Sequence, residues 1–219
     1  MNNSILKFFK WVGIIILGAF VVIVIIRIPV VMNKKATEEA VAKIHATKLT
    51  LDDVEGKDLV ALSSEGHEKT GAPDYNATVA GIDANGNGIR DDVEQAIFNA
   101  YPQSLSSDGA GANNARTRAV LLQYALALQM EMTQTIVNTE TVTAVIENKD
   151  RALNCIWSIS SRADMKKFIE ETDKNEKFVE KLQINNDSRK KYQEDFYKYL
   201  GSYSSPNNGC DLDLSKLPN

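Results

Sequence analysis

The chain has 219 residues, of which 43% are hydrophobic, and a formal net charge of −4 at pH 7. No acidic residue precedes Glu38, so residues 33–219 carry 22 basic against 29 acidic side chains and a net charge near −7. Such a surface argues against nucleic-acid binding, because phosphates need Lys and Arg to neutralise them, and favours a cation or a basic protein surface as partner. The same stretch is long enough for one domain with a hydrophobic core.

The N-terminal part carries one long apolar run. Residues 11–26 contain no charged side chain and lie between Lys10 and Arg27. A helix of this length spans about 24 Å, and apolar neighbours on both sides extend it toward the roughly 30 Å of a hydrocarbon core. A cleaved signal peptide begins in a similar way, but no small-residue cleavage site follows here. The sequence therefore predicts a transmembrane anchor through residues 11–31, within a first segment of residues 1–32.

The orientation of this anchor does not follow from the flanking charges, because basic residues lie on both sides of it. A long domain is translocated largely regardless of those charges. Since the features described next suit an oxidising, calcium-rich compartment, we expect the N-terminus in the cytoplasm and the main domain in the periplasm. The predicted localisation is a bacterial inner membrane, crossed once.

Oxygen-bearing side chains recur at regular positions in residues 83–94, which read Asp-Ala-Asn-Gly-Asn-Gly-Ile-Arg-Asp-Asp-Val-Glu. Calcium takes six to eight oxygen ligands around a tightly curved backbone. Gly88 stands at the sixth position, where the turn needs a residue that adopts positive φ easily. The candidate ligands are the side chains of Asp83, Asn85 and Asn87, the backbone carbonyl of Ile89, the side chain of Asp91, and Glu94 as a bidentate ligand.

This stretch resembles the calcium loop of the EF-hand family at every diagnostic position. The resemblance covers the loop and the helix after it, whereas residues 71–81 contain Pro and Gly and predict an irregular segment in place of the first EF-hand helix. It implies one Ca²⁺ ion bound as in bacterial envelope proteins, with a Kd on the order of 10⁻⁴ to 10⁻³ M. The alternative interpretation is an Asn- and Gly-rich turn that precedes a helix.

The chain has two cysteines, Cys155 and Cys210. An even number in an exported domain favours a disulfide, which would join the C-terminal tail to a helix. A buried free thiol at Cys155, with an incidental cysteine in the tail, is the alternative.

The remaining sequence predicts an all-α fold, in which the transmembrane helix is followed by a small helical bundle with one EF-hand-like calcium loop. Residues 33–80 are expected to form a juxtamembrane helix and a linker, and residues 81–219 a calcium-stabilised helical domain with a C-terminal tail. Within that domain, apolar periodicity and capping residues predict helices at 91–101, 113–137, 140–160, 164–182 with a bend within 172–177, and 187–200. The helix at 113–137 is apolar nearly all round, so we expect it at the centre.

No familiar catalytic motif occurs in the sequence. It lacks a Gly-x-Ser-x-Gly elbow, a His-Glu-x-x-His motif and a phosphate loop, and its only histidines are His45 and His67. We therefore predict a protein without enzymatic activity, a membrane-anchored periplasmic calcium-binding protein that acts as a protein-binding or structural module. Two versions stay open, an inhibitor or immunity protein that neutralises a toxin and an accessory subunit of an envelope assembly.

Two alternatives belong to other functional classes. A peptidoglycan hydrolase could use paired carboxylates, for which the 29 acidic residues supply many candidates. A calcium sensor would have to expose an apolar groove when the ion binds. The aromatic residues Tyr192, Phe196 and Tyr199 have helical spacing, and we expect them to pack in the core and not to form a binding face.

Overall fold

The computed structural model describes residues 33–60, 74–102, 112–205 and 209–217, together with Val12 and Ile16. Within these ranges all regular secondary structure is helical, which confirms the predicted all-α class. The predicted anchor lies outside the described residues except at Val12 and Ile16. Among the residues that the structure does describe, no helix combines the length and the apolar character that a membrane crossing requires.

The helices lie close to their predicted positions. A helical stretch covers residues 33–46, and the elements that follow are α2 (Leu51–Glu55), α3 (Asp91–Ala100), α4 (Ala112–Thr133), α5 (Thr139–Ile159), α6 (Met165–Gln183), α7 (Asp187–Tyr197) and the 3-10 helix η1 (Leu214–Lys216). Side-chain caps explain where several begin, because Asn138, Asp164 and Asn186 accept hydrogen bonds from backbone N–H groups in the first turns of α5, α6 and α7. Helix α6 is continuous through residues 172–177, where the sequence predicted a bend.

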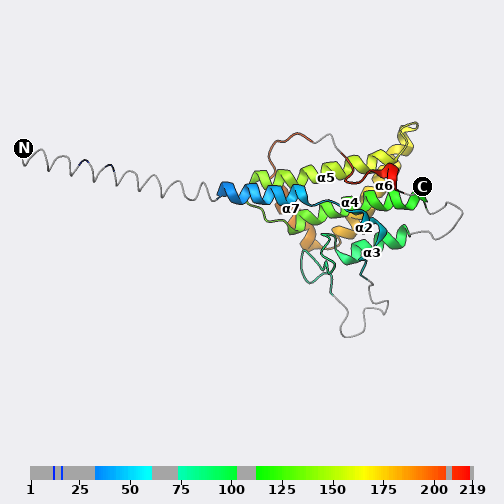
Figure 1. Ribbon diagram of the computed structural model, residues 1–219, viewed down its shortest axis with the longest axis horizontal. Helices are drawn as coiled ribbons and strands as arrows, with labels where there is room; N and C mark the ends of the chain where they lie inside the picture. The colour runs from blue at the N-terminus through cyan, green and yellow to red at the C-terminus, as the bar shows by residue number, and fades with distance from the viewer. Residues whose placement is uncertain are drawn as a thin grey trace, which may run out of the picture.

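Helix α4 forms the centre of the bundle, as predicted. Residues 118–132 are buried without exception, and the helix contacts α2, α3, α5, α6 and α7 (Figure 1). A helix enclosed on all sides must find partners for its polar side chains inside the protein. The carboxylate of Glu131, which is fully buried, accepts hydrogen bonds from Tyr197 Oη at 2.8 Å and Gln193 Nε2 at 2.7 Å and lies 3.3 Å from Lys149 Nζ. This cluster joins α4 to α5 and α7.

The aromatic residues of α7 divide between the core and the surface. Phe196 is buried and Tyr197 packs beside it against the core, with their ring centroids 5.7 Å apart. The helix ends at Tyr197, so Tyr199 lies beyond it and is 55% exposed. The predicted helix at 187–200 was therefore too long, and the prediction that Tyr199 packs in the core was wrong.

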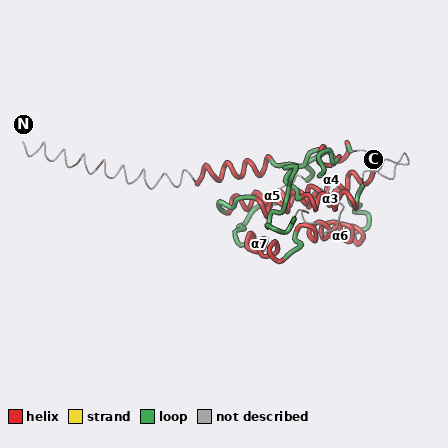
Figure 2. The backbone as a smooth tube through the Cα atoms, turned by 90° about the horizontal axis from the view of Figure 1, so that it is seen from below, coloured by secondary structure: helices red, strands yellow, loops and turns green. Residues whose placement is uncertain are grey.

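The helical stretch 33–46 packs directly on the body of the protein. It runs alongside α5, whereas α6 and α7 lie on the other side of the bundle (Figures 1 and 2). Asn138 Nδ2 donates to Thr37 Oγ1 at 2.8 Å, and Asn148 Nδ2 donates to the Ile44 carbonyl at 3.3 Å. Since the Ile44 side chain is fully buried, the stretch contributes to the same core as the helices that follow.

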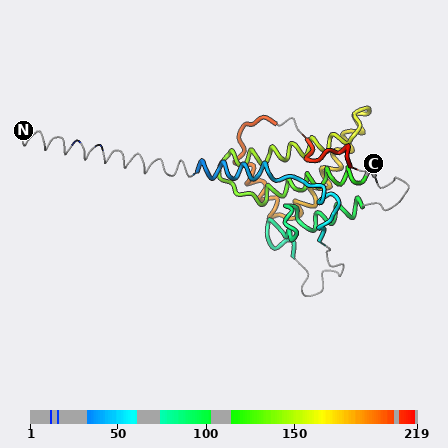
Figure 3. Tube along the Cα trace, viewed as in Figure 1, coloured from blue at the N-terminus to red at the C-terminus, as the bar shows by residue number. Residues whose placement is uncertain are grey.

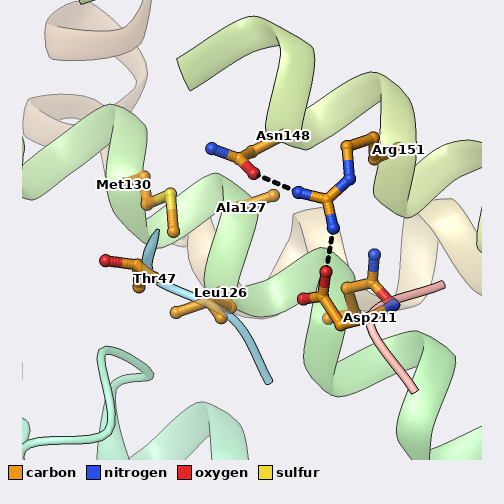
Figure 4. A pocket seen from close by; sticks show the side chains of 8 residues that line it. Thr47, Leu126, Ala127, Met130, Asn148, Arg151 and Asp211 are labelled. Atoms are coloured by element: carbon orange, nitrogen blue, oxygen red, sulfur yellow. Dashed lines mark hydrogen bonds and ion pairs between the residues drawn. The ribbon is translucent and has the colours of Figure 1, made fainter. Parts of the chain in front are cut away.

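The C-terminal residues 209–217 form a strap across this core. The sulfur atoms of Cys155 and Cys210 lie 2.05 Å apart, the distance of a disulfide bond. The next residue, Asp211, pairs with Arg151 of α5, which also donates to Asn148 Oδ1 at 2.7 Å (Figure 4). The second Asp211 carboxylate oxygen accepts a hydrogen bond from the backbone N–H of Leu49 at 3.0 Å. The disulfide at Cys210 and the largely buried ion pair at Asp211 therefore hold two adjacent residues of the strap against α5.

Removing the disulfide should destabilise the protein measurably. Closing a loop between positions 55 residues apart lowers the entropy of the unfolded chain enough to stabilise the fold by about 4 kcal/mol on the chain-entropy model. We expect the oxidised wild type to unfold at a clearly higher urea concentration than Cys210→Ser. A reductant should lower the wild-type midpoint toward that of the variant and leave the variant unchanged. Equal midpoints for oxidised and reduced wild type would contradict this expectation.

Candidate functional site

The segment 74–90 consists of turns and bends with no regular helix, and it forms a compact set of turns at the edge of the helical body (Figure 3). Helix α3 begins at Asp91, within the 83–94 loop, and no helix lies directly before the loop, unlike the two-helix arrangement of an EF-hand. Gly88 has a φ of 86°, and a Cβ atom there would lie 2.8 Å from Leu126 Cδ1 of α4. The sixth loop position thus needs glycine for its backbone conformation, and the loop packs closely against α4 at this point.

Two carboxylates close the loop through its own backbone. Asp83 accepts hydrogen bonds from the N–H groups of Gly86 and Gly88, each at 2.8 Å, through its two oxygens. Asp91 accepts a hydrogen bond from the N–H of Ala84 at 3.0 Å. The first and ninth positions of the predicted ligand set therefore determine the curvature of the loop.

Glu94 brings three further predicted positions together. It lies in the first turn of α3 and is only 1% exposed. Asn87 Nδ2 donates to Glu94 Oε1 at 2.9 Å, and Asn85 Nδ2 donates to Glu94 Oε2 at 3.1 Å. Ile89 is fully buried, and its N–H donates to Asn87 Oδ1 at 2.9 Å. The side chains at the third and fifth positions thus converge on the buried carboxylate at the twelfth.

The electrostatic environment disfavours a negative charge on this carboxylate. Burial raises the pKa of Glu94 to about 7, the carboxylates of Asp53 and Asp91 act in the same direction, and the two Asn amides oppose the shift. The pKa of Asp91 is raised as well, first by burial and then by Asp83 and Asp92. Among the described residues, no Lys or Arg forms an ion pair with Glu94 or Asp91. Both buried acidic groups therefore lack a basic partner in the part of the chain that the structure describes.

The donor set suits a hard cation only if the asparagines take part. Among the described residues, no cluster of three or more His, Cys, Asp or Glu side chains is arranged to hold a metal ion. Asn85 and Asn87 here present their amide nitrogens to Glu94, while their oxygens accept hydrogen bonds from the backbone N–H groups of Asn87 and Ile89. A half-turn of each amide group would bring its oxygen toward Glu94 and would break these two backbone hydrogen bonds. Such rotations leave the shape of the side chain unchanged. Amide and carboxylate oxygens around one buried point are ligands that Ca²⁺ takes.

Two fully buried arginines, which sequence reasoning missed, fasten this region to the bundle. Arg90 pairs with Asp92 and donates to the carbonyl of Leu182 at the end of α6 at 2.7 Å. Arg189 of α7 donates to the carbonyls of Tyr75, Val79 and Thr78 and to the side chains of Asn76 and Asn185. The sequence around Arg189 is highly charged and reads as a solvated helix face, so no periodic signal marked this residue.

Replacing Arg189 should release the segment that leads into the loop. We expect Arg189→Lys and Arg189→Ala each to lower the free energy of unfolding by about 3 kcal/mol, because three backbone carbonyls lose the donor that they share and a lysine ammonium cannot reproduce the guanidinium geometry. Urea denaturation measures the effect, with the exposed neighbour Lys190→Ala as the matched control. A variant Arg189→Lys as stable as the control would overturn the assigned role.

The raised pKa of Glu94 also predicts how stability depends on pH in the presence of a chelator. Folded protein holds a proton on this carboxyl up to about pH 7, whereas the unfolded chain releases it near pH 4.5. The folded state binds more protons between these values, so stability falls as pH rises through this window, by up to about 3 kcal/mol. Urea midpoints at pH 5 and 7.5 should differ more for the wild type than for Glu94→Gln, which cannot titrate. If the stability of both proteins depended on pH in the same way, Glu94 would not be the group whose titration lowers the stability.

Comparison with known proteins does not add to this chemistry. No protein-family model matches the chain, and no curated protein or solved structure matches it. The interpretation of the 83–94 loop therefore rests on the geometry and charge of its own residues.

Proposed function

We propose that the 83–94 loop binds one Ca²⁺ ion, which stabilises the helical domain. The ligands would be the side-chain oxygens of Asp83, Asn85, Asn87, Asp91 and Glu94 and the backbone carbonyl of Ile89. The observation that carries this proposal is the buried Glu94 carboxylate, on which two Asn amides converge while no basic side chain among the described residues pairs with it. A bound cation would supply the missing positive charge, since a buried carboxylate without such a partner is costly.

The surroundings of the loop favour a structural ion over a sensor. Ile89 and Val93 are fully buried, and Gly88 lies against α4. An ion held here would join the loop, which packs against α4, to the first turn of α3. A sensor must instead expose an apolar groove on binding, and the apolar side chains of this loop already belong to the core.

For the whole chain, we propose a membrane-anchored periplasmic protein, held by residues 11–31, that acts as a protein-binding or structural module. The disulfide between Cys155 and Cys210 is typical of proteins in an oxidising compartment. The acidic balance of residues 33–219 favours a partner with a basic surface, because opposite charge steers association. An inhibitor or immunity protein and an accessory subunit of an envelope assembly both fit these properties.

Calcium should raise the melting temperature of the full-length chain, purified in detergent. Binding at a hundredfold excess over Kd stabilises the folded state by about 2.7 kcal/mol, which corresponds to a shift of roughly 5 to 10 °C for a domain of this size. Glu94→Gln removes the bidentate carboxylate and keeps the shape of the side chain, so it should abolish the shift. The control Glu140→Gln makes the same change at an exposed position in the first turn of α5 and should shift like the wild type.

Either of two results would reject the calcium site. One is a wild-type melting temperature that is the same in calcium and in chelator, which would make the loop a turn that precedes α3. The other is an equal calcium shift in Glu94→Gln, which would place the ion elsewhere. Magnesium provides a further comparison, because it demands near-octahedral geometry and keeps several of its waters, and should therefore give a smaller shift.

A further inference from the structure

A pocket of about 340 Å³ lies beside the 83–94 loop. Three separate parts of the chain line it. Lys43 and Thr47 contribute from the end of the helical stretch 33–46 and the residue after it. The turns at residues 80–88 form a second side. Gln129, Thr133 and Gln134 contribute from the C-terminal end of α4. Its volume suits a small organic ligand.

The side chains of this pocket are rich in hydrogen-bond acceptors. Thr47 Oγ1 donates its proton to the Lys43 carbonyl at 3.0 Å, and Thr133 Oγ1 donates to the Gln129 carbonyl at 2.9 Å. Both hydroxyls can therefore offer a ligand only their oxygen lone pairs. Asp83 lies on the loop side of the pocket and adds a carboxylate.

Gln129 is the most informative lining residue, because it is 2% exposed. Its Nε2 donates to the Ala80 carbonyl at 2.6 Å, whereas its Oε1 is buried and has no hydrogen-bond donor among the described residues. Buried carbonyl oxygens without a donor are uncommon in folded proteins and call for an explanation. The oxygen atom itself is not exposed, so a ligand that carries N–H groups would satisfy it once the Gln129 side chain turns toward the pocket.

The pocket also has a positive side. Lys43 is exposed, and no ion pair joins its ammonium to another described residue. Gln134 stands beside Thr133 and can both donate and accept. The C-terminal end of α4 carries a partial negative charge that favours a cation. The lining thus combines acceptors from α4 and the loop with Lys43, which has no ion-pair partner among the described residues.

We propose that this pocket binds a zwitterionic amino compound, namely an amino acid or the end of a short peptide. The ligand ammonium donates to the oxygens of Gln129, Thr133 and Asp83, and the ligand carboxylate pairs with Lys43. The inference goes beyond the calcium proposal and does not require it, because Gln129, Thr133 and Lys43 are outside the predicted ligand set. The pocket and the loop share Asp83 and Asn87, so an ion in the loop would adjust the strength of binding without creating it.

Ligand-observed saturation-transfer NMR on the full-length chain in detergent tests this proposal. The probes are the common L-amino acids, D-alanine and glycylglycine, each at up to about 10 mM, where ligands with millimolar Kd still bind appreciably. The probe with the strongest signal is then titrated beside its N-acetyl form and its amide, which lack the ammonium and the carboxylate respectively. We expect N-acetylation to weaken binding about tenfold or more, since it removes charge-assisted hydrogen bonds.

Two variants separate the parts of the site. Lys43→Ala should weaken binding of the zwitterion several-fold and leave the amide unaffected, because only the zwitterion carries a carboxylate for the lysine to pair with. Thr133→Val removes one acceptor with little change in shape, and it should weaken both ligands. Thr133 is exposed at the end of α4, so this variant is expected to fold, whereas a change at the buried Gln129 need not leave the fold intact.

The proposal is overturned if no probe binds, if the N-acetyl form binds as well as its parent, or if Lys43→Ala has no effect on the zwitterion. Running the titration with Glu94→Gln, in calcium and in chelator, keeps the two proposals apart. Binding of the amino compound by this variant supports the pocket even if the calcium site fails. A calcium-dependent melting temperature without any probe binding supports the loop and rejects the pocket.

Discussion

The burial of α4 on every side is the constraint on which the rest of the structure depends. Its apolar residues form the core, and each polar residue within it has to reach a partner on a neighbouring segment. Arg118 donates to the carbonyls of Val54 and Tyr101, at 2.7 and 2.8 Å, and so holds the ends of α2 and α3. Gln123 bonds to the backbone of the C-terminal strap, and Glu131 joins α5 and α7. The central helix therefore organises the fold through its polar side chains as much as through its apolar ones.

The candidate calcium loop depends on the same helix. Gly88 approaches Leu126, and Gln129 bonds to the carbonyl of Ala80 just before the loop. Arg90 and Arg189 hold the opposite side against α6 and α7. Because the loop is fastened on both sides, Glu94 is buried where solvent cannot stabilise its charge, and this burial raises its pKa. The property that suggests a cation is thus a consequence of packing around the loop.

Helix positions were predictable to within a few residues wherever a capping residue precedes a periodic apolar pattern. Asp164 before α6 is an example, because a cap and a hydrophobic stripe are both local signals. The buried face of α3 was less predictable. Val93 and Ile97 are buried, as apolar residues four positions apart on a helix would be, but Glu94 and Phe98 are buried as well and Ala100 is exposed. A glutamate on a buried face contradicts simple periodicity, and only its neighbours from the loop explain why it lies there.

The sequence by itself determined the helical class, the central place of α4 and the spacing of the oxygen-bearing side chains in the 83–94 loop, because each depends on residues close together in the chain. Only the tertiary structure decided which distant groups meet. Arg189 bonds to carbonyls more than a hundred positions away, and Lys43, Asp83 and Gln129 line one pocket from three separate segments. Contacts of this kind leave no periodic trace in the sequence, since they depend on how the helices pack and not on the conformation of any one of them.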